Sequence, residues 1–130
     1  MTTTATSPQH LMSLFAERAA AGDVDGLLEL YAPDGVFEPQ PGTVLRGPEQ
    51  IRAALSGFAA TRPRIEYTGA GGCVIVDDIA LVSNAWAMTA QLPDGGSHRD
   101  GGVSADVLRR QGDGSWLILI DQPRGTVVAG

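Results

Sequence analysis

Two aspartates in the sequence have the type and spacing that acid/base chemistry requires. Asp106 and Asp121 lie on either side of Asp113-Gly114, a strong signal for a two-residue hairpin turn. Such a turn places Asp106 directly opposite Asp121, with both side chains on one face of the hairpin. A three-residue turn would slip the register by one residue and pair Asp106 with Ile120 instead.

Two carboxylates that close together in an apolar site do not both ionise easily. One pKa is expected to rise, and the two groups are expected to titrate jointly. A carboxylic acid kept neutral in this way can donate a hydrogen bond to an oxyanion that develops on a substrate. The structural alternative places Asp121 in water at a strand end and bonds Asp106 to a nearby backbone group or tryptophan.

Glu38 is a third candidate. It precedes Pro39 at the end of a short predicted strand, where a carboxylate that faces a pocket is placed to act as a general base. A rim residue that faces solvent fits the same position equally well.

The long predicted strand 79–92 places three further side chains on one face. Trp86 and Met88 are expected to wall a pocket there, and Asn84 to offer an amide. Tryptophan and methionine at strand spacing are also common in an ordinary core.

The predicted helices and strands that position these side chains follow a simple order along the sequence. Ser7-Pro8 caps a first helix, Gly22 closes it, and from Arg64 onward the hydrophobic period changes from 3.6 to 2. The predicted fold class is therefore α+β, with helices packed on one face of an antiparallel meander. Residues 1–7 are expected to form a flexible tail and residues 8–130 a single domain. Helices are predicted over 8–21, 24–31 and 47–60, and strands over 36–38, 43–46, 65–68, 73–76, 79–92, 103–110 and 116–121.

The later strands are apolar on both faces, although the helices can cover only one. Leu117 and Leu119 alternate with Trp116, Ile118 and Ile120 in the last strand. A sheet face of this kind is typical of a protein–protein surface. The pattern predicts a homodimer.

Composition excludes several classes of function. The 130 residues carry a net charge of −6, without a cluster of basic residues of the kind that nucleic acid or an anionic membrane requires. Cys73 is the only cysteine, which favours a reducing, cytoplasmic location. His10 and His98 stand alone in the sequence, so we expect no metal site, and no motif indicates a cofactor. The expected partners are a small apolar molecule and a second copy of the chain.

Several segments together resemble the nuclear transport factor 2-like superfamily, especially its SnoaL-like and ketosteroid isomerase-like branches. The resemblance covers about residues 9–124. It rests on AGDVDGL at residues 21–27, YAPDGVF at 31–37, GPEQI at 47–51, ADVLRRQGDGSW at 105–116 and IDQP at 120–123.

This resemblance implies a cystatin-like cone, in which three N-terminal helices and a strongly curved sheet enclose a pocket and the convex face forms a dimer. It implies a cofactor-free isomerase, cyclase or dehydratase acting on a small carbonyl compound. A non-catalytic ligand-binding or accessory dimer is the alternative, and an epoxide hydrolase is a third possibility.

The resemblance also assigns roles to single residues. Asp106 falls on the oxyanion-hole aspartate of the isomerases, and Glu38 aligns with their proton-shuttling base once one deletion is allowed. Phe15 stands where the isomerases carry a tyrosine, and a phenyl ring cannot replace that hydrogen-bond donor. Ser104 stands where the related epoxide hydrolases carry an arginine. The remaining residues expected in the pocket are Tyr31, Leu108 and Leu119.

Overall fold

Capping residues set the limits of the helices. The computed structural model describes residues 3–69 and 71–125. Ser7 accepts a hydrogen bond from the backbone N–H of His10 at 3.0 Å, and Asp23 accepts one from Gly26 at 2.9 Å, so each caps the helix that follows it. Gly22, with a φ of 69°, ends the first helix in the left-handed conformation that glycine adopts without strain. The helices are α1 (Pro8–Ala20), α2 (Val24–Leu28) and α3 (Gly47–Ala60).

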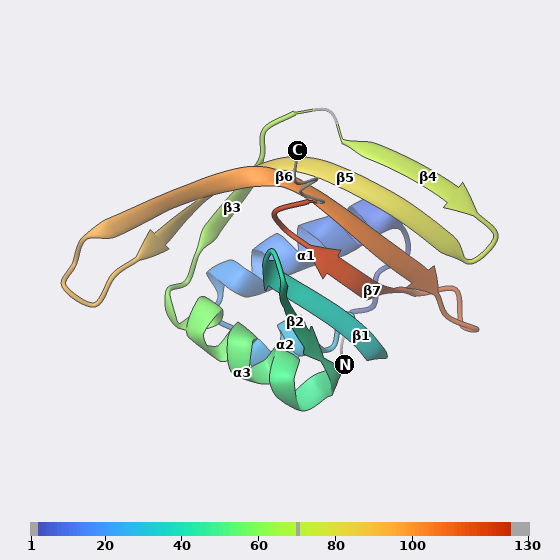
Figure 1. Ribbon diagram of the computed structural model, residues 1–130, viewed down its shortest axis with the longest axis horizontal. Coiled ribbons are helices and arrows are strands. Elements are labelled where there is room, and N and C mark those ends of the chain that lie inside the picture. Colours follow the sequence, from blue (N-terminus) through green and yellow to red (C-terminus); the bar gives the residue numbers. More distant parts are fainter. Residues whose placement is uncertain (1–2, 70, 126–130) are drawn as a thin grey trace.

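Seven strands in the described residues form one sheet. Their order is β2-β1-β7-β6-β5-β3, and β4 also pairs with β5. The sheet curves over the helices, which lie together on its concave side (Figure 1). The strands are β1 (Tyr31–Gln40), β2 (Thr43–Arg46), β3 (Arg64–Tyr67), β4 (Gly72–Val76), β5 (Ile79–Gln91), β6 (Ser97–Arg110) and β7 (Trp116–Gln122).

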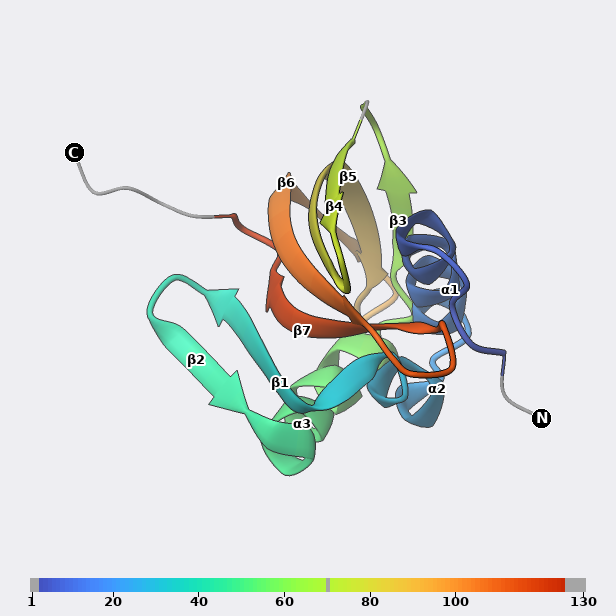
Figure 2. The same ribbon diagram turned by 90° about the vertical axis from the view of Figure 1, so that its right-hand side faces the viewer.

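This architecture confirms the predicted α+β class with three helices and a curved sheet. One pairing differs from the predicted antiparallel meander, because β1 lies parallel to β7. The last strand of the described residues, β7, therefore lies inside the sheet, between β1 and β6. Seen from the side, the β1–β2 hairpin extends away from the main body of the sheet (Figure 2).

The strand β1 begins earlier than the sequence predicts. Helix α2 stops at Leu28 instead of Tyr31, because Tyr31 already pairs with Ile118 of β7. The predicted turn at residues 32–35 becomes an irregularity within β1, which resumes its pairing at Val36. Gly35 permits this path, since a Cβ there would lie 2.8 Å from the carbonyl oxygen of Ala32.

The strand β6 is also longer than predicted, beginning at Ser97 instead of Val103. Its added part includes Gly101 and Gly102, which pair with Ala87 and Trp86 of β5. Two consecutive glycines interrupt the apolar alternation, so the sequence pattern hides this half of the strand.

The core lies between the helices and the concave face of the sheet. Its largest fully buried apolar side chains are Leu11, Leu27, Leu30, Ile51, Leu55 and Leu108. None of the helices in the described part of the chain has the length and hydrophobicity to cross a membrane.

Ala5 differs from the flexible tail that the sequence predicts over residues 1–7. This residue is buried and its carbonyl oxygen accepts a hydrogen bond from the backbone N–H of Trp116 at 2.9 Å. Thr3 is held as well, because its carbonyl oxygen accepts from the Arg18 guanidinium at 2.6 Å. The first two residues of the predicted tail lie outside the described residues.

Candidate functional site

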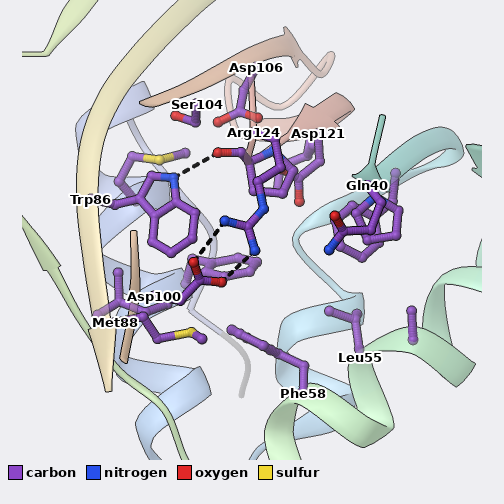
Figure 3. A pocket seen from close by; sticks show the side chains of 18 of the residues that line it. Gln40, Leu55, Phe58, Trp86, Met88, Asp100, Ser104, Asp106, Asp121 and Arg124 are labelled. Atoms are coloured by element: carbon purple, nitrogen blue, oxygen red, sulfur yellow. Dashed lines mark hydrogen bonds and ion pairs between the residues drawn. The ribbon is translucent and has the colours of Figure 1, made fainter. Parts of the chain in front are cut away.

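A cavity of about 270 Å³ opens between the helices and the concave face of the sheet. An apolar cavity of about 150 Å³ is enough to hold benzene, so this one has room for roughly two fused rings. Figure 3 shows its walls from close by. The lining residues are Met12, Phe15, Phe37, Pro39, Gln40, Ala54, Leu55, Phe58, Ile65, Tyr67, Trp86, Met88, Asp100, Ser104, Asp106, Ile118, Asp121, Pro123 and Arg124.

Asp106 and Asp121 face each other across β6 and β7 in the wall of this cavity. The expected pairing is present, although the turn is not the expected one. Next to the turn, Arg110 pairs with Trp116, which is the register of a longer turn. A β-bulge then shifts the register between Ile118 and Ile120, and this shift brings Asp121 opposite Asp106. Bulges next to active sites commonly redirect a side chain in this way.

Hydrogen bonds hold the two carboxyls in place. The Tyr31 hydroxyl donates to Asp121 Oδ2 at 2.5 Å, and the backbone N–H of Gln122 donates to Asp106 Oδ1 at 2.9 Å. The side chains of Asp121 and Ser104 also lie close enough to Asp106 to influence its pKa. Because both aspartates are buried, these contacts restrict the positions of their carboxyls.

The surroundings of the two carboxyls affect their pKa values differently. Burial raises the pKa of Asp106 well above its usual range, and the neighbouring charge of Asp121 raises it further. Burial also raises the pKa of Asp121, but hydrogen bonds from Asp106 and Tyr31 oppose that rise. Burial and the nearby carboxylates raise the pKa of the Tyr31 hydroxyl, which therefore stays protonated as a donor. The arrangement favours a neutral Asp106 beside an ionised Asp121.

The rest of the wall is mostly apolar. The structure places Trp86, Met88 and Phe15 on it, three of the residues expected there. The ring of Phe15 packs against Phe58 with centroids 6.1 Å apart. Tyr67 also lines the cavity, but its hydroxyl donates to the carbonyl oxygen of Met12 at 3.1 Å.

Glu38 does not reach the cavity, which corrects the role expected for it as a base. In the parallel pairing, Phe37 lies beside Asp121 and shares its face, so Glu38 points to the other side of β1. Its carboxylate accepts hydrogen bonds from the Gln122 amide at 3.1 Å and from the Gly42 backbone at 3.2 Å.

Four other expected pocket residues are also absent from the lining. Leu108 is fully buried in the core, and Leu119 lies at the bulge. Tyr31 acts from behind Asp121 through its hydroxyl. Asn84 has a buried side-chain nitrogen without a hydrogen-bond partner among the described residues.

The sequence gives no sign of two residues that the cavity brings together. Arg124 forms an ion pair with Asp100, and both line the cavity. Asp100 lies in the part of β6 that the glycines conceal, and Arg124 follows the last strand with no recognisable spacing. Ser104, by contrast, lies two residues before Asp106 on the same face of β6. Strand period alone therefore predicts that Ser104 faces the cavity.

The donor set does not indicate a metal centre. The described residues contain no cluster of three or more histidine, cysteine or acidic side chains that could hold an ion. Among the same residues, no arginine forms an ion pair with Asp106 or Asp121, so the arrangement expected of an epoxide hydrolase is not assembled.

Comparison with known proteins supports the architecture. The SnoaL-like domain family matches residues 13–117. No curated protein sequence matches the chain.

Three solved structures illustrate the similarity of fold. A candidate calcium/calmodulin-dependent protein kinase II association domain from Xanthomonas campestris is 23% identical, with a TM-score of 0.79 over 92% of this chain and 84% of that one. A nuclear transport factor 2-like superfamily protein from Salmonella enterica is 16% identical, with a TM-score of 0.77 over 92% and 89%. A candidate scytalone dehydratase from Novosphingobium aromaticivorans is 14% identical, with a TM-score of 0.78 over 87% and 77%. At these identities the similarity establishes the fold alone.

Proposed function

Because the chain belongs to the SnoaL-like domain family, we propose that it is a cofactor-free acid/base enzyme acting on a small, largely apolar carbonyl compound. A single observation carries the proposal: two buried carboxyls face each other in the wall of an apolar cavity. Isolated buried carboxyls cost several kcal/mol, and perturbed ones cluster at functional sites. The structural neighbours include candidate dehydratases, which fits this class of chemistry.

The two aspartates supply complementary functions. Asp106 keeps its proton and donates it toward the carbonyl oxygen of the substrate, where negative charge develops. Asp121 is ionised and accepts a proton from the carbon next to that carbonyl, which leaves an enol. Returning the proton at another carbon gives an isomerase. Transfer of the proton from Asp121 to a hydroxyl on the next carbon, which leaves as water while the enol proton returns to Asp106, gives a dehydratase. Phe15 contributes packing only, so the oxyanion relies on Asp106.

Hydrogen–deuterium exchange tests this chemistry without knowledge of the natural substrate. Bicyclic ketones such as tetralone and indanone fit the cavity, and NMR in D₂O reports exchange at the carbon beside their carbonyl. We expect the protein to accelerate exchange for at least one ketone by on the order of 100-fold or more, the range of positioned acid/base groups. Asp106→Asn and Asp121→Asn should each remove most of the acceleration.

Glu38→Gln is the matched control for Asp121→Asn, because it also replaces a carboxylate with an amide but lies outside the cavity lining. Exchange by this variant should equal that of the native protein. Equal rates in the Asp121→Asn variant and the native protein would contradict the proposal.

Non-catalytic ligand binding is the alternative, and the position of Glu38 favours it. With Glu38 turned toward Gln122, the cavity lacks the separate base that the resemblance implied. The same NMR samples distinguish the two functions. Ketones that shift protein resonances but show no accelerated exchange would identify a binding protein.

A homodimer through the convex sheet face forms part of the proposal. Val74, Leu81, Val107 and Ile120 are paired in one row across four strands, on the face opposite the helices. Val74 is 63% exposed and Leu81 55%, which is unusual for such residues in a monomer. A second copy of the same chain matches this surface, because a two-fold interface needs one self-complementary patch.

A cytoplasmic location also belongs to the proposal. Cys73 is exposed and free. A free surface thiol is more typical of a reducing compartment than of an oxidising one.

A further inference from the structure

The cavity has a second polar group, distant from the paired aspartates. Asp100 and Asp106 both face the cavity from β6, six residues apart along the strand. Arg124 reaches across to Asp100 from the segment that follows β7, as Figure 3 shows. Among the described residues of the lining, Arg124 carries the one positive charge.

Several contacts fix this pair. Arg124 Nη1 donates to Asp100 Oδ1 at 2.8 Å, and Nη2 donates to Oδ2. The guanidinium lies 5.5 Å from the ring centroid of Trp86, whose indole N–H donates to the carbonyl oxygen of Pro123 at 2.8 Å. The Arg124 and Asp100 side chains remain 30% and 25% exposed, so a ligand in the cavity can still reach them.

The pair presents a donor and an acceptor side by side. A guanidinium has five N–H donors, and a carboxylate oxygen can accept more than one hydrogen bond. A hydroxyl group is both donor and acceptor, so it can donate to Asp100 and accept from Arg124 together. A carboxylate can only accept, and it would have to compete with Asp100 for the guanidinium.

The charge balance points the same way. Asp100 neutralises Arg124, and the ionised Asp121 leaves the cavity with a negative charge. The negative charge repels an anionic ligand, and Arg124 does not offset this repulsion because it is paired with Asp100.

We propose that Arg124 and Asp100 form a second recognition site that selects a neutral hydroxyl group and rejects a carboxylate. This inference rests on the proposed function, since it describes the far end of the same substrate. The substrate class is then a neutral compound about two rings in size, with a carbonyl at Asp106 and a hydroxyl at Asp100. Acids of the same shape are excluded.

Calorimetric titration with a naphthol and with the naphthoic acid substituted at the same carbon tests this selection at neutral pH. We expect the native protein to bind the naphthol at least about tenfold more tightly. Asp100→Asn leaves the charge of Arg124 uncompensated, so the affinity for naphthoate should rise about tenfold or more. Binding of the naphthol should weaken in the same variant.

Asp34→Asn is the matched control, because Asp34 is also an aspartate paired with an arginine, Arg109, but lies outside the cavity lining. The affinity for naphthoate should change by less than about threefold in this variant, because the loss of charge does not reach the ligand. If the unpaired guanidinium prevents Asp100→Asn from folding, Asp100→Ser removes the same charge with a smaller side chain.

An unchanged preference in a folded Asp100 variant would overturn the inference, as would tighter binding of naphthoate by the native protein. Neither measurement depends on turnover. Failed ketone exchange combined with the expected switch in binding would reject the catalytic proposal and retain the recognition site.

Discussion

At the scale of single residues, the Tyr31 hydroxyl donates to Asp121 and not to Asp106. A hydrogen bond to the charged form of a carboxyl favours that form. Tyr31 therefore assigns the negative charge to Asp121, and the shared proton stays on Asp106. In the proposed function, this asymmetry supplies both the acid and the base from two residues of the same type.

The proton on Asp106 makes the stability of the fold depend on pH. An unfolded aspartate loses its proton near a pKa of about 3.9, whereas burial keeps Asp106 protonated in the folded protein well above that pH. The stabilisation is fully present below about pH 4 and is lost as pH rises toward the folded pKa of Asp106. The slope for one proton is about 1.4 kcal/mol per pH unit.

Asp106→Asn removes this dependence, because an amide does not titrate and can still bond to Asp121 and to Gln122. We expect the variant to be less sensitive to pH above about pH 4 and more stable than the native protein at neutral pH. Urea unfolding across the range from pH 4 to pH 8 measures the difference. Parallel stability curves for the two proteins would show that Asp106 is ionised in the fold.

At the scale of elements, β6 depends on Gly102 to bring Trp86 into the cavity wall. The indole lies against the strand, and a Cβ at Gly102 would come 3.4 Å from its Cζ2 atom. A Cβ at this distance would already be in van der Waals contact with the ring, so the γ carbons of a branched side chain would compete with the indole for space. The same glycine that hides the strand in the sequence thus positions an aromatic wall.

Gly102→Val is expected to push the indole out of place and to destabilise the protein by about 1–3 kcal/mol, the usual cost of overpacking. Urea unfolding measures the stability, and calorimetric titration should show weaker binding of the naphthol. Gly72→Val in β4 is the matched control, since a Cβ there meets nothing within 4 Å. That change should be neutral or slightly stabilising, because valine favours strands. Equal effects of the two substitutions would refute a special role for Gly102.

The register of the last hairpin shows what the sequence could predict. The spacing of apolar residues predicts every helix and most strands of the described structure. The predicted pairing of Asp106 with Asp121 is also present. The turn itself is longer than expected, and the bulge between Ile118 and Ile120 compensates for it. Two shifts of one residue cancel, so the predicted pairing is right although the predicted turn is wrong.

Other parts of the site could not be predicted from sequence patterns. Glu38 was expected in the cavity because it precedes Pro39 at a strand end and aligns with the base of the isomerases. Its parallel pairing with β7 depends on residues more than 80 positions away. The Arg124–Asp100 pair joins two segments that no local signal connects. Contacts of this kind follow from the packing of the whole sheet.

At the scale of the whole molecule, the apolar row on the convex face should decide the oligomeric state. Leu81 lies inside this row and is paired with Val74 and Val107. Leu81→Lys would place a charge in the proposed interface and should convert a dimer into a monomer at micromolar concentration. Sedimentation velocity measures the change.

Val44→Lys provides the control for this substitution. Val44 is 41% exposed on β2, outside the row, so the same kind of change there should leave the dimer intact. A native protein that sediments as a monomer at micromolar concentration would contradict the proposed interface.

The central position of β7 also has a consequence for the order in which the protein folds. On a ribosome, β1 and β2 emerge well before the strand that joins them to the rest of the sheet. The first hairpin must therefore wait, with its pairing edge open, until β7 is synthesised. Contacts so distant in sequence slow folding, because loop closure comes before the contacts that reward it. The nascent chain is thus most exposed to aggregation just before its final strand is complete.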